Sequence, residues 1–572
     1  MKGSFMDSKA PKALIPQFSI PQFSIPKRTM GTRMFKLSLI LSFIGLGSAC
    51  KTNSEEGSHS LSDPRGLIQK SLVNYNGSIE CASGSFVMLE KIEDLPQIIK
   101  FAAETHKSLR IVSSATPHSY SQVICPTDGG MVVDMQKFNR IITLDGNASS
   151  PSVTVEPGVK LVDLQEYLHK QGYGFPVSPD YNDVSMAGAV ATGAHHSSLK
   201  ISSAVSDWLM ELTLINGLGQ RVVLTGAQLD TARVHLGLLG AVVSMKFKIV
   251  PQFKLSFKVE RFPDDHIGTK LAEQVAQFDY ARASWFPHTD EYILESFDGV
   301  SVDTPGESFG TAWTSTPDIS ILGDLPSQVL NKSKFASCTA ATLRAKTFGG
   351  FFKVIDSPKK NPVGFSHEMM AGNCRTSKCP WQIGIKARTM EAALDLKDFP
   401  GWSEDVKKIL DQRQACFING IYLRFSKASA SALGQASGQD VVMFEIHIAQ
   451  NNKPSLEKWS DVYDEILQMT LKKYKGRPHW GKNSTPYFTD LGPATFPKWK
   501  EFENLRQKHD PKMLFTSDLW SAMAQYSSSK PPLLKEGCAL TQSCICEIDS
   551  HCGQGARCVS GGYFQDARVC RK

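Results

Sequence analysis

Residues 185–198 read Ser-Met-Ala-Gly-Ala-Val-Ala-Thr-Gly-Ala-His-His-Ser-Ser, and most of these side chains are small. Such a run lets the backbone approach a bulky ligand, and its successive N–H groups can converge on an anion, usually a phosphate. The P-loop and Gly-x-Gly-x-x-Gly patterns do not fit, because no lysine follows Gly193 and the spacing from Gly188 is wrong. A small-residue turn between core strands is the alternative that composition leaves open.

Two further patterns contain groups that could do chemistry. Residues 477–482 read Arg-Pro-His-Trp-Gly-Lys, and their cations and indole suit an anionic or polyhydroxylated ligand. The alternative is an exposed basic turn whose Trp480 packs into the core. His118 lies in the polar stretch 113–121, where a lone histidine is usually a surface or capping residue.

Elements before residue 252 are expected to position the small-residue run 185–198 and the stretch 113–121 that contains His118. Apolar runs at 86–89 and 109–112 flank a helix with Asp94 as its cap, which predicts a β-α-β unit with the His118 stretch at the end of its second strand. Loops at such strand ends often bind ligands. A strand at 153–156 and a helix at 161–171 predict a second unit. Residues 209–224 predict a hairpin around Asn216-Gly217, and residues 241–249 a strand.

The pattern changes after residue 252. Apolar and polar residues alternate at 253–260, residues 422–425 and 441–448 predict long strands, and residues 456–474 predict an amphipathic helix. Strands followed by a helix, without β-α-β alternation, indicate an α+β domain that covers the first one.

Composition and the chain start indicate where the protein works. Of the 572 residues, 41% are hydrophobic and 21% are charged, which are fractions typical of a globular protein. The mild net charge of +7 does not indicate nucleic-acid binding. Basic residues precede the apolar run 37–46, which is too short to span a bilayer, and Gly-Ser-Ala-Cys follows at 47–50. This arrangement resembles a bacterial lipobox with Cys50 as the lipidated residue, and plain cleavage after Ala49 is the alternative. We expect an exported lipoprotein on a membrane surface.

Cysteine usage agrees with export. Without Cys50, twelve of the 13 cysteines remain, and six of them lie at 538–570. Disulfides are favoured there over zinc, because no Cys-x-x-Cys pair occurs and His551 stands alone; fifteen pairings stay open. We expect no metal site.

The order of motifs resembles the vanillyl-alcohol-oxidase-type flavoproteins, within them the sugar-lactone and alditol oxidases. The residues that carry the resemblance are Pro117-His118-Ser119, Asp128-Gly129-Gly130, Val155-x-x-Gly158-Val159, Ala187-Gly188-Ala189, Thr192-Gly193-Ala194-His195-x-Ser197, Leu236-Gly237-x-x-Gly240 and His479-Trp480-Gly481-Lys482. The cysteine-rich end is similar to the tail of the plant-type members. The resemblance runs from about residue 66 to residue 572.

The resemblance implies FAD as cofactor, joined covalently to His118. The other residues it places on FAD are Thr116, Pro117, Ser119, Gly188, Thr192, Gly193, Ala194, His195, Ser197, Gly240 and Val242. It gives Lys482, Arg424 and His479 catalytic positions beside the flavin and substrate. Relatives have Glu-x-Arg where this chain has Tyr422-Leu423-Arg424, and glycine where it has His196. The His196 side chain must therefore either point away from the diphosphate or crowd it.

The resemblance also implies the architecture, an α+β fold in which a two-subdomain FAD-binding domain of the vanillyl-alcohol-oxidase type carries an α+β cap domain and a disulfide-rich tail. We place a leader with the export signal at 1–50, a tether at 51–65, the FAD-binding domain at 66–251, the cap at 252–478, a return segment at 479–530 and the tail at 531–572.

The expected activity is oxidation of a sugar 1,4-lactone or related polyol by hydride transfer to FAD, with O2 as acceptor and H2O2 as product. Two alternatives remain: an alditol or sugar dehydrogenase with another electron acceptor, and a non-catalytic lipoprotein that binds flavin or carbohydrate.

Overall fold

We analysed a computed structural model that describes residues 70–308, 325–347, 362–371, 387–525 and 535–572, apart from 76, 82–84, 115, 128, 148, 452, 490 and 491. The predicted leader and tether, with Cys50, lie outside the described residues, as do Cys374 and Cys379. Within the described part, none of the helices combines the length and apolar character needed to cross a membrane.

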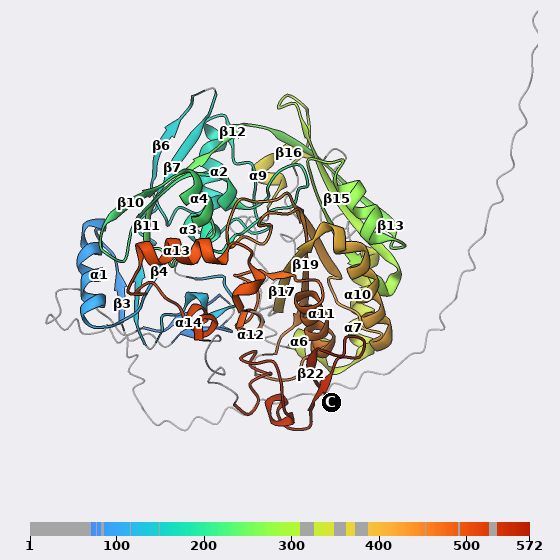
Figure 1. Cartoon of the computed structure of the whole chain (residues 1–572). Coiled ribbons are helices and arrows are strands. Elements are labelled where there is room, and N and C mark those ends of the chain that lie inside the picture. Colours follow the sequence, from blue (N-terminus) through green and yellow to red (C-terminus); the bar gives the residue numbers. More distant parts are fainter. Residues whose placement is uncertain are drawn as a thin grey trace, which may run out of the picture. The chain divides into compact units, whose positions relative to one another are not determined.

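A parallel three-stranded sheet begins the fold. Its order is β3-β5-β4, formed by Ser85–Met88, Met131–Asp134 and Leu109–Val112, and α1 (Leu95–Glu104) connects β3 with β4 (Figure 1). The predicted β-α-β unit is therefore confirmed, with Leu95, Ile98 and Ile99 on the buried face of α1. The Asp94 side chain makes no capping hydrogen bond, because a short 3-10 turn, Ile92–Asp94, already leads into the helix.

An antiparallel five-stranded sheet follows in the order β10-β9-β11-β7-β6. These strands are Arg221–Leu224, Leu209–Ile215, Ala241–Lys248, Ser152–Val155 and Ile141–Asp145. The hairpin prediction is confirmed, since Arg221 pairs with Ile215. The predicted second β-α-β unit is wrong: β7 has antiparallel neighbours, and α2 (Leu161–Lys170) leads to the short β8 (Tyr173–Gly174), which pairs with β12 (Val250–Pro251).

The small-residue run is not a simple turn. Its first part forms helix α3 (Met186–Thr192), and Gly193 ends the helix with a left-handed φ of 72°. Glycine is the residue that takes this conformation at least cost, so Gly193 sets the direction of the chain toward His195. The buried residues of α3 pack in the same core as α2 and the five-stranded sheet.

The second half is built on an antiparallel eight-stranded sheet with the order β16-β13-β15-β14-β18-β19-β17-β20. The strands in that order are Val363–Phe365, Lys254–Pro263, Glu291–Val300, Tyr280–Phe286, Ile421–Ser426, Val441–Ala449, Ala387–Asp395 and Arg477–Pro478. Helices α5 (Ile267–Val275), α10 (Phe399–Arg413) and α11 (Ser460–Lys472) share one core with its strands (Figure 1).

The segment after β20 packs into the core of the first half. It contains α12 (Pro486–Thr489), α13 (Trp499–His509) and α14 (Asp518–Gln525). Trp480 stacks on Phe488 and Phe496, with ring centroids 4.8 Å apart in both pairs. The other α-helices among the described residues are α4 (Gly226–Ala232), α6 (Leu325–Lys332), α7 (Lys334–Thr347) and α9 (Ser366–Met369).

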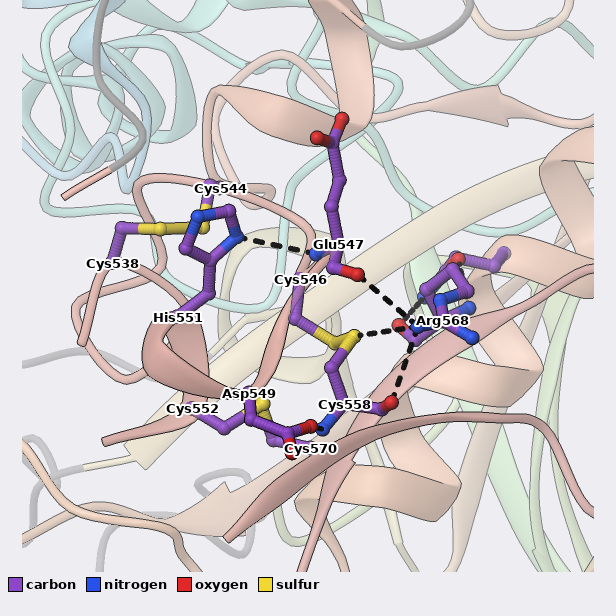
Figure 2. The surroundings of a disulfide bond; sticks show 11 residues. Cys538, Cys544, Cys546, Glu547, Asp549, His551, Cys552, Cys558, Arg568 and Cys570 are labelled. Atoms are coloured by element: carbon purple, nitrogen blue, oxygen red, sulfur yellow. Dashed lines mark hydrogen bonds between the residues drawn. A yellow bond between two sulfur atoms is a disulfide. The ribbon is translucent and has the colours of Figure 1, made fainter. Parts of the chain in front are cut away.

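The tail is held together by three disulfides, Cys538–Cys544, Cys546–Cys558 and Cys552–Cys570 (Figure 2). Its strands β21 (Arg557–Ser560) and β22 (Arg568–Arg571) form a hairpin. The fully buried Glu465 on α11 accepts hydrogen bonds from the backbone N–H groups of residues 562–564 at 2.7–2.8 Å. The tail is thereby attached to the helix that backs the eight-stranded sheet.

Candidate active site

A cavity of about 600 Å³ is lined by residues of both halves of the chain. All three residues expected to be catalytic, Lys482, Arg424 and His479, lie in its wall. Of the residues expected on the cofactor, nine line it: Thr116, Pro117, His118, Ser119, Gly188, Thr192, Ala194, His195 and Gly240. The structure therefore brings together residues that are up to about 360 positions apart in the sequence.

Three of the predicted cofactor residues do not line this cavity. Gly193 borders a smaller space beside Val234. Ser197 is buried, where its hydroxyl accepts from the backbone N–H of Phe425 at 2.9 Å and bonds the carbonyl of Ala281. Val242 belongs to the apolar core. The side chains of Ser197 and Val242 therefore stabilise the fold and do not line the cavity.

His118 follows β4, as predicted. Its side chain is covered by a short arm that contains β1 (Leu72–Val73), Tyr75 and β2 (Glu80–Cys81). The His118 ring lies 5.1 Å from the ring of Tyr75, centroid to centroid, in a stacked arrangement. The arm is held by a disulfide between Cys81 and Cys125 and by a hydrogen bond from Asn74 to the carbonyl of Ser119. Burial lowers the pKa of His118 to about 4, so its imidazole is neutral and keeps a lone pair for bond formation.

The features around Gly240 and Arg110 fit a bound dinucleotide. Gly240 has a φ of 145°, and a Cβ there would lie 2.3 Å from the carbonyl oxygen of Ile215. Arg110 lines the cavity and bonds the carbonyl of Leu236 at 2.7 Å, while its Nε has no partner among the described residues. Burial lowers the pKa of Arg110 to about 10. A buried cation beside bare backbone is suited to an anion such as a diphosphate.

The catalytic candidates belong to a buried cluster of charges. Lys482 Nζ lies 2.9 Å from an oxygen of Glu391 and 2.5 Å from one of Glu445. Arg424 pairs with the same two carboxylates, at 2.7 Å from Glu445. Glu391 and Glu445 are opposite each other on β17 and β19, a placement that destabilises a sheet when both are ionised and unpaired. The two cations bridge the pair and remove that penalty.

The cations also keep the carboxylates ionised. Burial would raise the pKa of Glu391, but Arg424 and Lys482 outweigh it and hold that pKa well below its ordinary value. Glu445 shows the same balance, with its pKa lowered by Lys482 and Arg424 against burial. Lys482 and Arg424 are thus fixed, paired charges within the cavity wall.

A second group of charges continues from Arg424. Asp180 lies 3.5 Å from Arg424 and 2.7 Å from Arg282, which in turn bonds Glu295 at 2.9 Å. The Tyr422 hydroxyl donates to Asp180 at 3.3 Å. Although burial opposes it, Arg282 and Arg424 lower the pKa of Asp180. Asp180 therefore presents a carboxylate to the cavity beside the position where relatives carry the glutamate of Glu-x-Arg.

The neighbouring histidines differ in environment. Burial lowers the pKa of His479 to about 3, and its Nδ1 accepts from the N–H of Gly481 at 3.0 Å. Burial, with Arg282 as the next cause, lowers the pKa of His196 to about 3 as well. The His196 ring packs against Tyr280 and Phe297 and is not part of the cavity wall, as expected for a side chain that points away.

Sequence reasoning missed Glu391, Glu445, Asp180, Arg282 and Arg110. A signal for the two glutamates was present, because each is an acid with apolar residues on both sides in a strand, where a buried charge needs a partner. Asp180 and Arg282 offer no comparable pattern, since their pairing depends on how the two halves meet.

Comparisons with known families agree with this geometry. The family described as FAD binding domain matches residues 84–225, and the family D-arabinono-1,4-lactone oxidase matches residues 245–523. A third, L-gulonolactone oxidase 2-like, C-terminal domain, matches residues 535–572. The chain therefore has, in order, the FAD-binding and lactone-oxidase domains of an FAD-dependent sugar-lactone oxidase.

Relatives of this family match most of the chain. L-gulonolactone oxidase 5 of Arabidopsis thaliana is 26% identical, with 88% of this chain and 91% of the relative covered. L-gulonolactone oxidase 3 of the same plant is 27% identical over 84% of this chain and 88% of its own length. L-gulonolactone oxidase of Bos taurus is 26% identical and covers 77% of this chain and 95% of its own length.

Two solved structures, both of cholesterol oxidases, have a fold similar to that of this chain. Cholesterol oxidase from Brevibacterium sterolicum, as its His121Ala mutant, is similar with a TM-score of 0.64 at 15% identity, covering 80% of this chain and 97% of that chain. A solvent-stable cholesterol oxidase has a TM-score of 0.61 at 16% identity, with 80% and 98% covered. These structures confirm the vanillyl-alcohol-oxidase-type architecture, the family matches confirm the FAD-dependent oxidoreductase class, and the three disulfides confirm the disulfide-rich tail.

Proposed function

We propose that the protein oxidises a carbinol group of a sugar 1,4-lactone similar to L-gulono-1,4-lactone. The supporting observation is the convergence of Lys482 and Arg424, from segments far apart in the sequence, on one cavity wall with their carboxylate partners. A protein that only stores or binds flavin has no need for two cations held in this way, of which Arg424 is buried and Lys482 is partly exposed. The relatives named L-gulonolactone oxidase support the choice of substrate class.

Bound FAD would supply the hydride acceptor for this oxidation. Lys482 and Arg424 supply positive charge to the cavity wall, which would stabilise the negative charge that grows on the hydride acceptor during the transfer. Glu391 and Glu445 fix the positions of both cations, so little reorganisation is needed during the reaction. His118, as a neutral imidazole, would hold the cofactor covalently.

Substrate hydroxyl groups would be recognised at the opposite end of the charge cluster. Asp180 can accept hydrogen bonds from hydroxyl groups, and Arg282 fixes its orientation. Tyr422 and Ser284 line the same cavity and add hydroxyl donors and acceptors. In this proposal Asp180 takes the part that relatives give to the glutamate of Glu-x-Arg.

We further propose that O2 accepts the electrons and that the protein acts outside the cytoplasm, anchored to a membrane through a lipid on Cys50. The support for export is the leader pattern together with the disulfides Cys81–Cys125 and Cys338–Cys416, which persist in oxidising compartments. Metabolic labelling with a palmitate analogue, compared between the natural chain and Cys50→Ser, tests the anchor. Equal labelling of both chains would contradict it.

The activity is tested by adding L-gulono-1,4-lactone to the purified yellow protein without oxygen. We expect the flavin absorbance to be lost, and to return with formation of H2O2 when air is admitted. Recovery only with an artificial acceptor would identify a dehydrogenase instead of an oxidase. If no lactone, alditol or sugar bleaches the flavin, the protein is a binding protein on this fold.

A further inference from the structure

The hydrogen bonds of His195 fix its proton count. Its Nδ1 lies 2.8 Å from the carbonyl oxygen of His196, and because a carbonyl only accepts, Nδ1 carries a proton. Its Nε2 lies 2.6 Å from an oxygen of Glu391. A second proton must therefore lie between Nε2 and that carboxylate, on one group or the other.

The surroundings of Glu391 place this second proton on histidine. The other oxygen of Glu391 is held by Arg424 and Lys482, and Glu391 is fully buried. Although burial works against the anion, these cations keep the pKa of Glu391 well below its ordinary value. A carboxylate that stays ionised leaves the proton on Nε2, so both ring nitrogens of His195 are N–H donors.

The other groups that face His195 leave this assignment unchanged. The His479 ring lies 5.5 Å away and is neutral, since its Nδ1 accepts from Gly481. His196, the next residue, is neutral and has no hydrogen-bond partner for either ring nitrogen among the described residues. A metal at His195, Glu391 and His479 would compete with the two cations that already occupy the carboxylate.

We propose that His195 is a buried imidazolium that acts as a positioning residue for the catalytic cations through Glu391. The imidazolium engages one oxygen of Glu391 and directs the other to Lys482 and Arg424. His195 comes from the loop after α3, which belongs to the first half, whereas Glu391 lies on β17 of the second half. The pair thus couples the cofactor-binding loop to the placement of both cations.

The protonation of His195 does not depend on the proposed activity, whereas its effect on turnover rests on it. The first test is therefore NMR of the purified holoprotein labelled with ¹⁵N-histidine, at about pH 7. We expect two ring N–H signals from His195, assigned by their loss in His195→Gln. A single ring N–H signal for His195 would overturn the proposal without reference to any substrate.

The second test is the rate of flavin reduction by the lactone in single turnover. We expect about a 100-fold loss in His195→Gln and in Glu391→Gln, with the double variant no slower than the slower single variant, because one coupled pair is broken in each case. The matched control is His196→Gln, which changes an equally buried neighbour outside the cavity wall and should leave the His195 signals and the rate unchanged.

The outcomes separate the two proposals. In a second outcome, His195 shows two N–H signals, but the rate losses of His195→Gln and Glu391→Gln multiply in the double variant. His195 would then be charged without positioning the catalytic cations through Glu391, and the proposed positioning role would be overturned. Two N–H signals in a protein whose flavin no lactone reduces would end the proposed function and leave the imidazolium assignment in place. If His195→Gln fails to fold, Glu391→Gln must still abolish the second N–H signal.

Discussion

Replacing Lys482 by methionine removes one of the two cations that bridge Glu391 and Glu445. A unit charge about 4 Å from the site where charge develops, at an effective dielectric constant of about 20, is worth about 4 kcal/mol. If this stabilisation develops fully in the transition state, its loss slows flavin reduction by about three orders of magnitude. We expect the variant to keep its FAD, because the ion pairs of Lys482 involve neither Arg110 nor Gly240.

The same substitution should create a pH dependence. Glu391 and Glu445 would share only Arg424, so the pKa of Glu445, which Lys482 helps to lower, would rise. When that carboxylate is ionised, the site carries an extra negative charge that opposes the reaction, and protonation removes it. Flavin reduction in Lys482→Met should therefore accelerate as the pH falls.

The assay is anaerobic stopped-flow absorbance with L-gulono-1,4-lactone at several pH values. The control is Lys200→Met, which breaks a half-exposed surface pair with Asp279 and should have little effect. A Lys482→Met rate within about threefold of the natural rate at about pH 8, where the carboxylates are ionised, would refute the argument.

Three further predictions concern other parts of the molecule. His118→Ala should release the yellow colour into the supernatant on acid precipitation, while the natural protein keeps it in the pellet; colour released by both would contradict covalent attachment. Burial raises the pKa of Glu457 from 4.5 to about 7, so this group takes up protons on folding and costs stability as the pH rises from 4.5 to 7. Glu457→Gln should therefore raise the free energy of unfolding at about pH 8, by at most about 3 kcal/mol, and leave it unchanged at about pH 4; equal changes at both pH values in chemical denaturation would contradict this. Cys552→Ser with Cys570→Ser opens a link between residues 18 positions apart and should destabilise the tail by about 3 kcal/mol, seen as faster proteolysis of residues 535–572; an unchanged cleavage rate would show that the contacts of Glu465 suffice.

Local patterns predicted the local structure well. The hairpin at 209–224 follows from two apolar runs around Asn216-Gly217, and its strand bounds agree with the expectation. The β-α-β unit followed from the spacing of apolar residues on α1. The error at 153–171 arose because strand direction is set by distant partners, here β11 and β6, which a local pattern does not contain.

The residues of the site likewise fall into two groups, those that local motifs predicted and those whose placement depends on tertiary contacts. Lys482, Arg424 and His118 were found because their motifs resemble those of relatives, and the structure places all three on one cavity. Glu391 and Glu445 face each other only through the register of β17 against β19, some fifty residues apart in the chain. Asp180 reaches Arg282 and Arg424 only once both halves are assembled. Charge pairs of this kind depend on tertiary geometry that the sequence alone did not reveal.

The bond between His195 and Glu391 has a consequence for protein engineering. A chimera that takes its substrate domain from a relative with another residue at the position of Glu391 would leave the charge of His195 without a partner where the two domains meet. Substrate preference in this scaffold is therefore not exchangeable by transplanting one module, unless both members of the pair are transferred together.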